Sequence, residues 1–138
     1  MLEMLKVTMK SIFIKQTNKS PEINFNYDTG ELKITGNSLV QNSYEFYTPL
    51  LEWIDDYVRA PKAKNTKVFI KVVYFTTDAS GFFIKILKRL EQLAMANHLV
   101  MVKWYYEEGD VDMRETIHMF RSLVPQLNLE SVVVKEVL

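Results

Sequence analysis

Three hydroxyl-bearing residues stand close together in the stretch VVYFTTDASGFFIKIL, residues 72–87, where an apolar strand-like run meets a helix-like one. A side-chain oxygen at the start of a helix accepts a backbone N–H and contributes about 1 kcal/mol, and Thr77, Asp78 or Ser80 could each do so. One cap is sufficient, so the other polar residues are either ordinary turn residues or groups with a chemical role. The chemistry that suits them is phosphorylation, because a phosphoryl group at a helix N-terminus meets free N–H groups and the positive end of the helix dipole.

Residues that could support catalysis lack the partners and the spacing that catalysis needs. Neither His98 nor His118 belongs to a motif that supplies a positioned partner, so both are interpreted as structural or partly exposed histidines. No G-x-S-x-G, P-loop or H-E-x-x-H segment occurs, and the chain contains no cysteine. The sequence therefore predicts no catalytic residue and no cofactor.

An acidic loop offers the carboxylates of Glu107, Glu108, Asp110 and Asp112. Oxygen ligands of this kind could bind Mg²⁺ or Ca²⁺, but the EF-hand order of acids around a central glycine is missing, and so is its closing glutamate. A solvated loop is the ordinary interpretation, and no metal site is predicted.

Composition places the chain among ordinary globular proteins. Its 138 residues suit one domain, 48% are hydrophobic, 25% are charged and the net charge is zero, which argues against a general nucleic-acid or membrane binder. Aromatic residues cluster in 44–57 and 104–106 without interleaved basic residues, so core packing or a protein interface explains them better than base stacking. Charged residues interrupt the apolar N-terminus and no apolar run approaches the ~20 residues of a membrane span, so a cytoplasmic protein is expected.

Apolar periodicity divides the chain into strands and helices. Alternation over 22–36 with a turn at Asp28–Gly30 predicts a β-hairpin, and residues 11–16 could add a strand before it. A helix is expected in 43–58, with Ser43 as its N-cap and Asn42 as the competitor. Further predicted elements are strand 67–75, expected to be covered on both faces, helix 82–97, strand 98–106, helix 113–123 and strand 129–138.

The order of these elements predicts an α/β fold with a mixed sheet. Helices alternate with strands in the second half, which implies parallel neighbours joined by right-handed crossovers, whereas the opening hairpin is antiparallel. We therefore expect a single domain over residues 1–138, in which an N-terminal hairpin is followed by βαβ units and helices pack on the sheet.

Three segments together resemble the SiaC family of bacterial regulatory phosphoproteins. They are GNSLVQNSYEFYTPLLEWIDDYV, VYFTTDASGFFIKILKRLEQL and VMVKWYYEEGDVDM, and the similarity runs from about residue 20 to residue 129. The family pattern has G-x-S-x-x-E-N-S/A before an aromatic helix, then a strand ending Y-F-N-T-S-S, then W-x-Y-E and acidic residues. The order and spacing of the motifs, rather than any one motif, carry the resemblance.

The resemblance implies a small STAS/SpoIIAA-like fold, similar to anti-sigma-factor antagonists, and no catalysis by this chain. It implies a partner-switching circuit in which a protein kinase adds a phosphate and a PP2C-type phosphatase removes it. The unphosphorylated form then binds and regulates an effector such as a diguanylate cyclase, which affects biofilm formation. No nucleic acid, membrane, metal or cofactor belongs to this picture.

Residue-by-residue matching assigns the family's phosphorylated threonine to Thr77. Thr76 stands where the family has asparagine, and Asp78 and Ala79 stand where it has two serines, so a phosphate on Thr77 would lie beside a carboxylate. DASG also resembles the D-S-S-G of STAS domains, which would select Ser80 instead, with Thr76 as a third candidate. Predicted partner contacts are Tyr74, Thr76, Asp78, Ser38 and Asn42.

Two other classes of function make different structural predictions. A small-molecule-binding or enzymatic domain, suggested by the Tyr and Trp content and the acidic loop, requires a well-formed pocket with convergent polar groups. An interaction protein requires a shallow surface around Thr77 bordered by exposed apolar residues.

Overall fold

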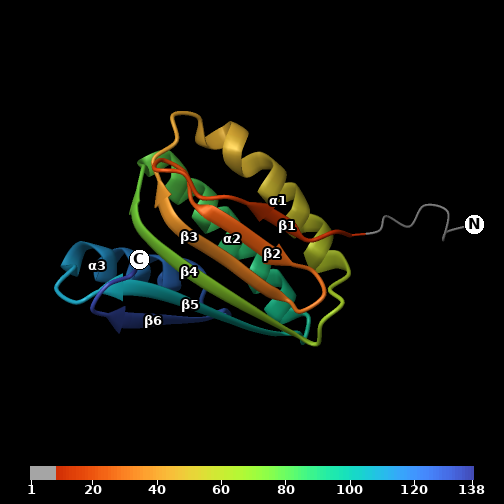
Figure 1. Cartoon of the computed structure of the whole chain (residues 1–138). Helices are drawn as coiled ribbons and strands as arrows, with labels where there is room; N and C mark the ends of the chain where they lie inside the picture. The colour runs from red at the N-terminus through yellow and green to blue at the C-terminus, as the bar shows by residue number, and fades with distance from the viewer. Residues whose placement is uncertain (1–8) are drawn as a thin grey trace, which may run out of the picture.

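Six strands form one sheet in the same order in which they follow one another along the chain (Figure 1). The computed structural model describes residues 9–138, so the expectation about a signal peptide, which depends on residues 1–8, lies largely outside the described part. The sheet consists of β1 (Ile12–Ile14), β2 (Glu22–Asn26), β3 (Glu31–Ser38), β4 (Asn65–Phe75), β5 (Leu99–Glu107) and β6 (Asn128–Val134). The predicted hairpin and the additional strand before it are confirmed.

The first two pairings of the sheet are antiparallel, and the remaining three, from β3 to β6, are parallel. Gly30 in the hairpin turn has φ 75°, and its amide donates to the carbonyl oxygen of Asn26 at 3.0 Å. Glycine adopts this conformation without steric cost, which is why the turn can be tight. The α/β fold class with a mixed sheet is therefore confirmed.

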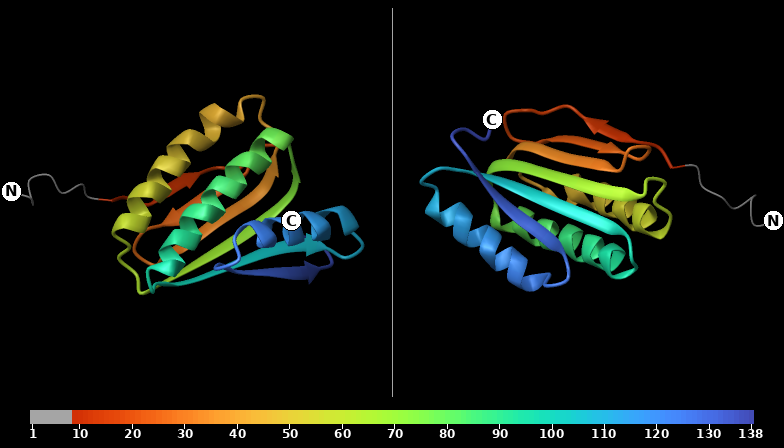
Figure 2. Two further views of the ribbon diagram at one scale, coloured as in Figure 1. Left: turned by 180° about the vertical axis from the view of Figure 1, so that it is seen from behind. Right: turned by 90° about the horizontal axis from the view of Figure 1, so that it is seen from below.

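Three helices connect the parallel strands: α1 (Ser43–Arg59), α2 (Thr77–Met95) and α3 (Val111–Leu123). Each parallel connection moves one strand further in the same direction, and right-handed crossovers then put all three helices on the same face of the sheet. The views in Figure 2 show the helices as one layer and the sheet as the other. The opposite face of the sheet carries no helix within residues 9–138.

This open face corrects one prediction about β4, which was expected to be buried on both sides. Its residues instead alternate between buried and more exposed positions, with Val68, Ile70 and Val72 facing the helices. Phe69 is the residue that weakened the alternation in the sequence, because an aromatic side chain occupies an open-face position between Lys67 and Lys71. An apolar ring on a half-open face is compatible with a one-sided sheet.

An aromatic cluster anchors the carboxyl ends of the central strands. Phe75, the last residue of β4, lies 5.3 Å from Phe83, 6.3 Å from Trp104 and 6.4 Å from Phe120, measured between ring centroids. Phe83, Trp104 and Phe120 are each almost completely buried, so the cluster joins α2, β5 and α3 to the end of β4. Packing of this kind holds the backbone that follows Phe75 in a fixed position.

The N-cap of the first helix lies one residue earlier than the favoured prediction. Asn42 is the N-cap of α1, and its side-chain oxygen accepts the Glu45 N–H at 3.1 Å, whereas the Ser43 side chain is buried. Pro49 lies inside the helix, which continues to Arg59. None of the helices within residues 9–138 is long and apolar enough to cross a membrane.

Candidate functional site

The loops that follow β3, β4 and β5 leave the sheet at the same edge, because these strands run parallel (Figure 1). In open α/β sheets, this carboxyl edge is where ligands and partners bind most often. The loop after β3 contains residues 39–42, the turn after β4 contains Thr76, and the loop after β5 contains residues 108–110. The candidate site is built from the first two of these connections.

Thr76 caps α2, which corrects the prediction that Thr77, Asp78 or Ser80 would do so. The Thr76 hydroxyl oxygen accepts the Ala79 N–H at 3.1 Å, and the Thr76 backbone is extended, with φ −77° and ψ 164°. The Thr76 carbonyl oxygen also accepts the Ser80 N–H at 3.1 Å. Thr76 is therefore occupied as the structural cap, and the helix begins at Thr77, earlier than the predicted range of 82–97.

The two remaining hydroxyls differ in how available they are. Ser80 donates its hydroxyl to the carbonyl oxygen of Thr77 at 2.6 Å and is half-buried. The Thr77 side chain is exposed, and its hydroxyl forms no hydrogen bond within residues 9–138. Of the three hydroxyls in the turn, that of Thr77 is the one that a modifying enzyme can reach without breaking a contact.

A hydrogen bond ties the turn to the neighbouring strand. The Thr76 N–H donates to the carbonyl oxygen of Ser38 at 3.1 Å, at the end of β3. The Ser38 side chain is completely buried, and its hydroxyl lies 2.6 Å from the hydroxyl of Tyr47 on α1. Burial raises the pKa of Tyr47 well above its usual value, so this hydroxyl stays protonated and the pair remains neutral.

Ser38 thus has a different role from the one predicted for it. A buried hydroxyl cannot touch a partner, so the expected direct contact is replaced by positioning of β3 against α1. The other four predicted contacts lie closer to the surface: Tyr74, Asn42 and Asp78 are exposed, and Thr76 is half-buried. Tyr74 is held through its backbone, because its N–H donates to the Asn37 side chain at 3.3 Å.

Two shallow hollows meet beside the turn. The first, of about 580 Å³, lies between the turn and the loop after β3, and it is lined by Lys19, Leu39, Val40, Gln41, Thr76 and Asp78. The second, of about 500 Å³, runs along the first turns of α1 and is lined by Ile14, Val40, Asn42, Glu45, Phe46, Pro49 and Leu50. Val40 lines both hollows, and we refer to the two together as the groove.

Exposed apolar side chains border this region. Leu39 is 39% exposed, Tyr44 is 70% exposed and Tyr74 is 64% exposed. The ring of Tyr44 packs edge-on against Phe82 of α2, with 6.4 Å between the ring centroids. Apolar groups gathered at a shallow groove are typical of a protein-docking surface rather than of a small-molecule site.

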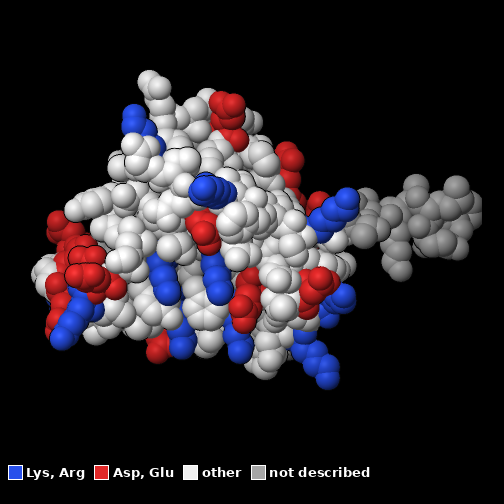
Figure 3. Space-filling model, viewed as in Figure 1, with Lys and Arg blue, Asp and Glu red and all other residues white. Residues whose placement is uncertain are grey.

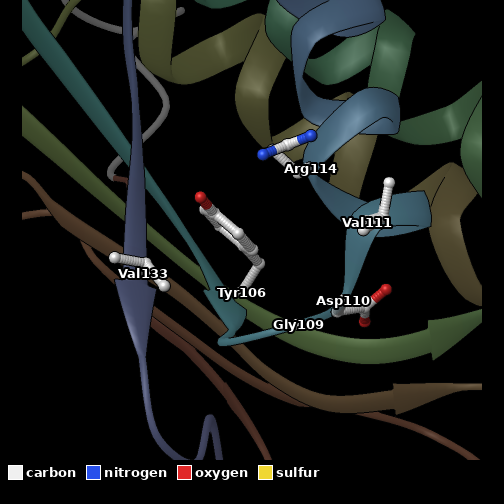
Figure 4. Close-up of a pocket in the computed structure, with 6 residues that line it drawn as sticks. All are labelled: Tyr106, Gly109, Asp110, Val111, Arg114 and Val133. Atoms are coloured by element: carbon white, nitrogen blue, oxygen red, sulfur yellow. The ribbon is translucent and has the colours of Figure 1, made fainter.

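A separate small cavity lies beside the acidic loop (Figure 4). It measures about 200 Å³ and is lined by Tyr106, Gly109, Asp110, Val111, Arg114 and Val133. Asp110 is the N-cap of α3: its carboxylate accepts the Met113 N–H at 3.0 Å and points away from Tyr106 in the figure. The cavity is smaller than a typical ligand site, and one of its polar groups is already occupied.

Glu107 and His98, two of the other polar residues considered from the sequence, make contacts within the fold. The Glu107 carboxylate accepts the Val137 N–H at 3.2 Å, and His98 lies 2.9 Å from the hydroxyl of Thr66. Partial burial lowers the pKa of His98, which favours its neutral form. His118 is exposed on α3. Among residues 9–138, no three histidine or carboxylate side chains converge as a metal site would require.

The fold and the site define a two-layer α/β domain with an exposed hydroxyl at a helix N-terminus beside a shallow docking groove. The chain belongs to the SiaC family of regulatory phosphoproteins, whose family model matches residues 14–134. The predicted family is therefore confirmed, and the matched range begins earlier and ends later than the range of the sequence motifs.

Solved structures of SiaC from Pseudomonas aeruginosa share the fold. SiaC in a crystal structure of the diguanylate cyclase SiaD in complex with its activator SiaC aligns with a TM-score of 0.82 and 20% identity, covering 89% of this chain and 99% of that one. The apo-SiaC crystal structure aligns with a TM-score of 0.77 and 21% identity, covering 91% and 98% of the two chains. An uncharacterized protein of Pseudomonas aeruginosa is 24% identical over 113 residues, which cover 82% of this chain and 89% of that protein.

The groove is the part of the candidate site that sequence reasoning did not locate. Its residues come from four separate segments, and two of its apolar members, Leu39 and Val40, stand in a short loop with no periodic pattern. A weak signal existed, because the connection between β3 and α1 contains two adjacent apolar residues where turns usually carry polar ones.

Proposed function

We propose that this protein is a non-enzymatic signalling phosphoprotein of a partner-switching circuit, with Thr77 as the regulated residue. A protein kinase phosphorylates the Thr77 hydroxyl, a PP2C-type phosphatase removes the phosphate, and the unphosphorylated form binds an effector. The observation that carries this proposal is the state of Thr77: it is exposed, makes no hydrogen bond within residues 9–138, and opens a helix of 19 residues.

The helix N-terminus accommodates a phosphate at this position. The N–H groups of the first turn and the positive end of the α2 dipole favour negative charge there. Lys19 lines the hollow beside the turn and adds a cation on the same side as Asp78. Asp78 works in the opposite direction, because its carboxylate repels a neighbouring phosphate.

Phosphorylation would add strong negative charge beside the apolar side chains of the groove. In the unmodified protein, the groove presents Leu39 and Val40, and exposed Tyr44 and Tyr74 extend the apolar surface around it. A phosphate brings about two negative charges to its rim, and a partner would then have to desolvate them on docking. The unmodified form is therefore the one that binds, with Tyr74, Asn42, Thr76 and Asp78 as contacts and Ser38 as a positioning residue.

The effector that we propose is a diguanylate cyclase. SiaC of Pseudomonas aeruginosa, which shares this fold, is an activator found in complex with the diguanylate cyclase SiaD. Membership of the same family supports an equivalent partner for this chain. The protein would then act in the cytoplasm, in a c-di-GMP circuit that affects biofilm formation, and it would need no cofactor of its own.

Phosphopeptide mapping after co-expression with the cognate kinase tests the assignment. We expect one phosphate, located on Thr77 and absent from Thr77→Val, which keeps the shape of the side chain but removes the hydroxyl. Thr76→Asn is the matched control, because asparagine can still cap α2 but cannot be phosphorylated. Modification of Thr77 should persist in this variant.

Two alternative results would replace the proposal. Phosphate confined to Ser80 would indicate the STAS-like switch that the DASG segment suggested. An unmodified protein that binds a small molecule in its cavities would indicate a ligand-binding domain instead.

A further inference from the structure

The open face of the sheet carries a cluster of basic side chains that is independent of the threonine turn. Side chains of β3, β4 and β5 alternate between the buried helix side and the open face of the sheet. The open-face positions include Lys33, Lys67, Lys71 and Lys103. Figure 3 shows several Lys and Arg side chains, with Asp and Glu side chains among them, on the face that Figure 1 presents. Because the lysines lie on three strands, the sequence alone does not bring them together.

Pairing register places aromatic rings between these cations. Phe69 pairs with Lys33 on one side and with Lys103 on the other. The Lys33 ammonium lies 5.9 Å from the centroid of the Phe69 ring, and the Lys71 ammonium lies 4.9 Å from the centroid of the Tyr105 ring. Phe69 and Tyr105 are half-buried, so each ring is partly exposed on the open side of the sheet with an ammonium over it.

A cavity of about 290 Å³ lies among these side chains. Its walls are formed by Glu31, Lys33, Thr35, Phe69, Lys71 and Tyr105. Glu31 lies 3.8 Å from Lys33, but Lys71 forms no ion pair within residues 9–138. The cavity therefore combines two aromatic rings, a hydroxyl, the paired Glu31 and Lys33, and a second cation, Lys71, that has no carboxylate partner within residues 9–138.

We propose that this cavity binds a free nucleotide, with its base stacked on Phe69 or Tyr105 and its phosphate bound by Lys71 and Lys33. Aromatic side chains on the exposed face of a sheet offer stacking surfaces for bases, and neighbouring lysines attract the phosphate. The lysines would exchange a weak contact with the rings for a charge-assisted hydrogen bond. The cavity is close in size to the smaller ligand sites of proteins, which suits one nucleotide unit.

The rings of Phe69 and Tyr105 favour a nucleotide over a partner that is only acidic. An acidic peptide would use Lys33 and Lys71 but would leave the faces of Phe69 and Tyr105 uncovered. Inorganic phosphate would do the same. Recognition of both a planar ring and a phosphate is what the combination of these residues provides.

Titration of the isotope-labelled full chain, followed by NMR amide shifts, tests this inference with AMP, GMP, adenosine and inorganic phosphate as probes. We expect saturable shifts with AMP or GMP around residues 33–35, 69–71 and 105, and weaker binding of adenosine and of phosphate alone. Lys71→Gln and Phe69→Leu should each weaken nucleotide binding by about fivefold or more. Lys88→Gln, an exposed lysine of α2, is the matched control and should bind as the wild type does.

Four results would overturn it: no saturable binding of either nucleotide, phosphate binding as tightly as AMP, equal losses in Lys71→Gln and Lys88→Gln, or shifts located elsewhere. Single-stranded oligoadenylate distinguishes the source of the nucleotide. Binding of the oligomer without binding of AMP would assign the face to single-stranded nucleic acid and reject a free nucleotide. Because the site is separate from Thr77, these results are independent of the phosphorylation experiment.

Discussion

The turns after β4 and β5 leave the same edge of the sheet, and each starts a helix with the same capping contact. In both, a side-chain oxygen accepts the N–H of the residue three positions later: Thr76 caps α2 and Asp110 caps α3. The first helical residue is Thr77 in one and Val111 in the other, and both side chains are exposed. An aspartate follows in each helix. The same capping contact therefore precedes a modifiable hydroxyl at the start of α2 and an inert isopropyl group at the start of α3.

The comparison indicates that the cap and the candidate switch are separate residues with separate roles. The Thr76 hydroxyl caps α2, so the Thr77 hydroxyl is not needed as the cap. The turn after β4 also borders the apolar groove, whereas the loop after β5 borders a cavity of about 200 Å³. Paired substitutions at equivalent positions can therefore distinguish local helix chemistry from recognition.

The largest effect is expected for charge at the first helical position. Thr77→Asp should weaken binding to a diguanylate cyclase effector by about tenfold or more, because a permanent charge must be desolvated at the groove, while Thr77→Val should preserve binding. Val111→Asp puts the same charge at the same position of α3 and should leave affinity unchanged. Calorimetric titration measures the affinity of all three variants. Equal losses of affinity for the two aspartate variants would contradict a specific role for the turn before α2.

The second effect concerns the buried hydroxyl pair of Ser38 and Tyr47, next to the turn before α2. Ser38→Ala should lower the free energy of unfolding by about 1–3 kcal/mol, because it leaves the buried Tyr47 hydroxyl without its partner. Adding Tyr47→Phe should restore part of this loss. Urea unfolding measures both variants, and a double variant no more stable than Ser38→Ala would show that the hydroxyl pair is not the cause.

Removal of the caps should have smaller and similar effects at the two turns. Thr76→Ala and Asp110→Ala should each cost about 1 kcal/mol of stability, because each leaves one first-turn N–H without its acceptor. Thr76→Asn and Asp110→Asn should lose much less, since asparagine is also a good cap. Thermal unfolding can compare the four variants, and a Thr76→Ala protein as stable as the wild type would be evidence against the assigned cap.

The smallest effect is expected at the second helical position. Asp78→Ser and Asp112→Ser should each cost about 0.3 kcal/mol at low salt, because each carboxylate interacts favourably with a helix N-terminus. Only Asp78→Ser should also increase phosphorylation of Thr77, because it removes a like charge beside the phosphate. Kinase assays on both variants test the difference. Identical rates in Asp78→Ser and the wild type would indicate that Asp78 does not oppose modification.

Much of the fold could be predicted because hydrophobic periodicity determines which faces are buried. The apolar stripe of α2 and the alternation of the β2–β3 hairpin both have this origin, and both were confirmed. Element boundaries were harder, since a cap depends on backbone angles that the sequence does not record. Thr76 and Asn42 became the caps in place of the favoured Thr77, Asp78, Ser80 and Ser43 for this reason.

The candidate site was less predictable, because it depends on contacts between distant segments. Thr77 could be nominated from the family resemblance, but its freedom from hydrogen bonds follows from the local geometry of Thr76 and Ser80. The groove needs the loop after β3 beside the turn after β4, and Ser38 is buried, with its hydroxyl next to that of Tyr47, nine residues later in α1. No local pattern contains that information.

The strand order has a consequence for how the molecule is made. Because each strand pairs with its predecessor in the chain, every pairing partner already exists when the next strand leaves the ribosome. Domains fold during synthesis from the N-terminus, and pairing consecutive strands closes shorter loops than pairing strands that are distant in the chain would. The groove and the turn are built from β1 to α2, so we expect them to begin to form before α3 is complete and to become fixed once Phe120 of α3 joins the aromatic cluster around Phe75.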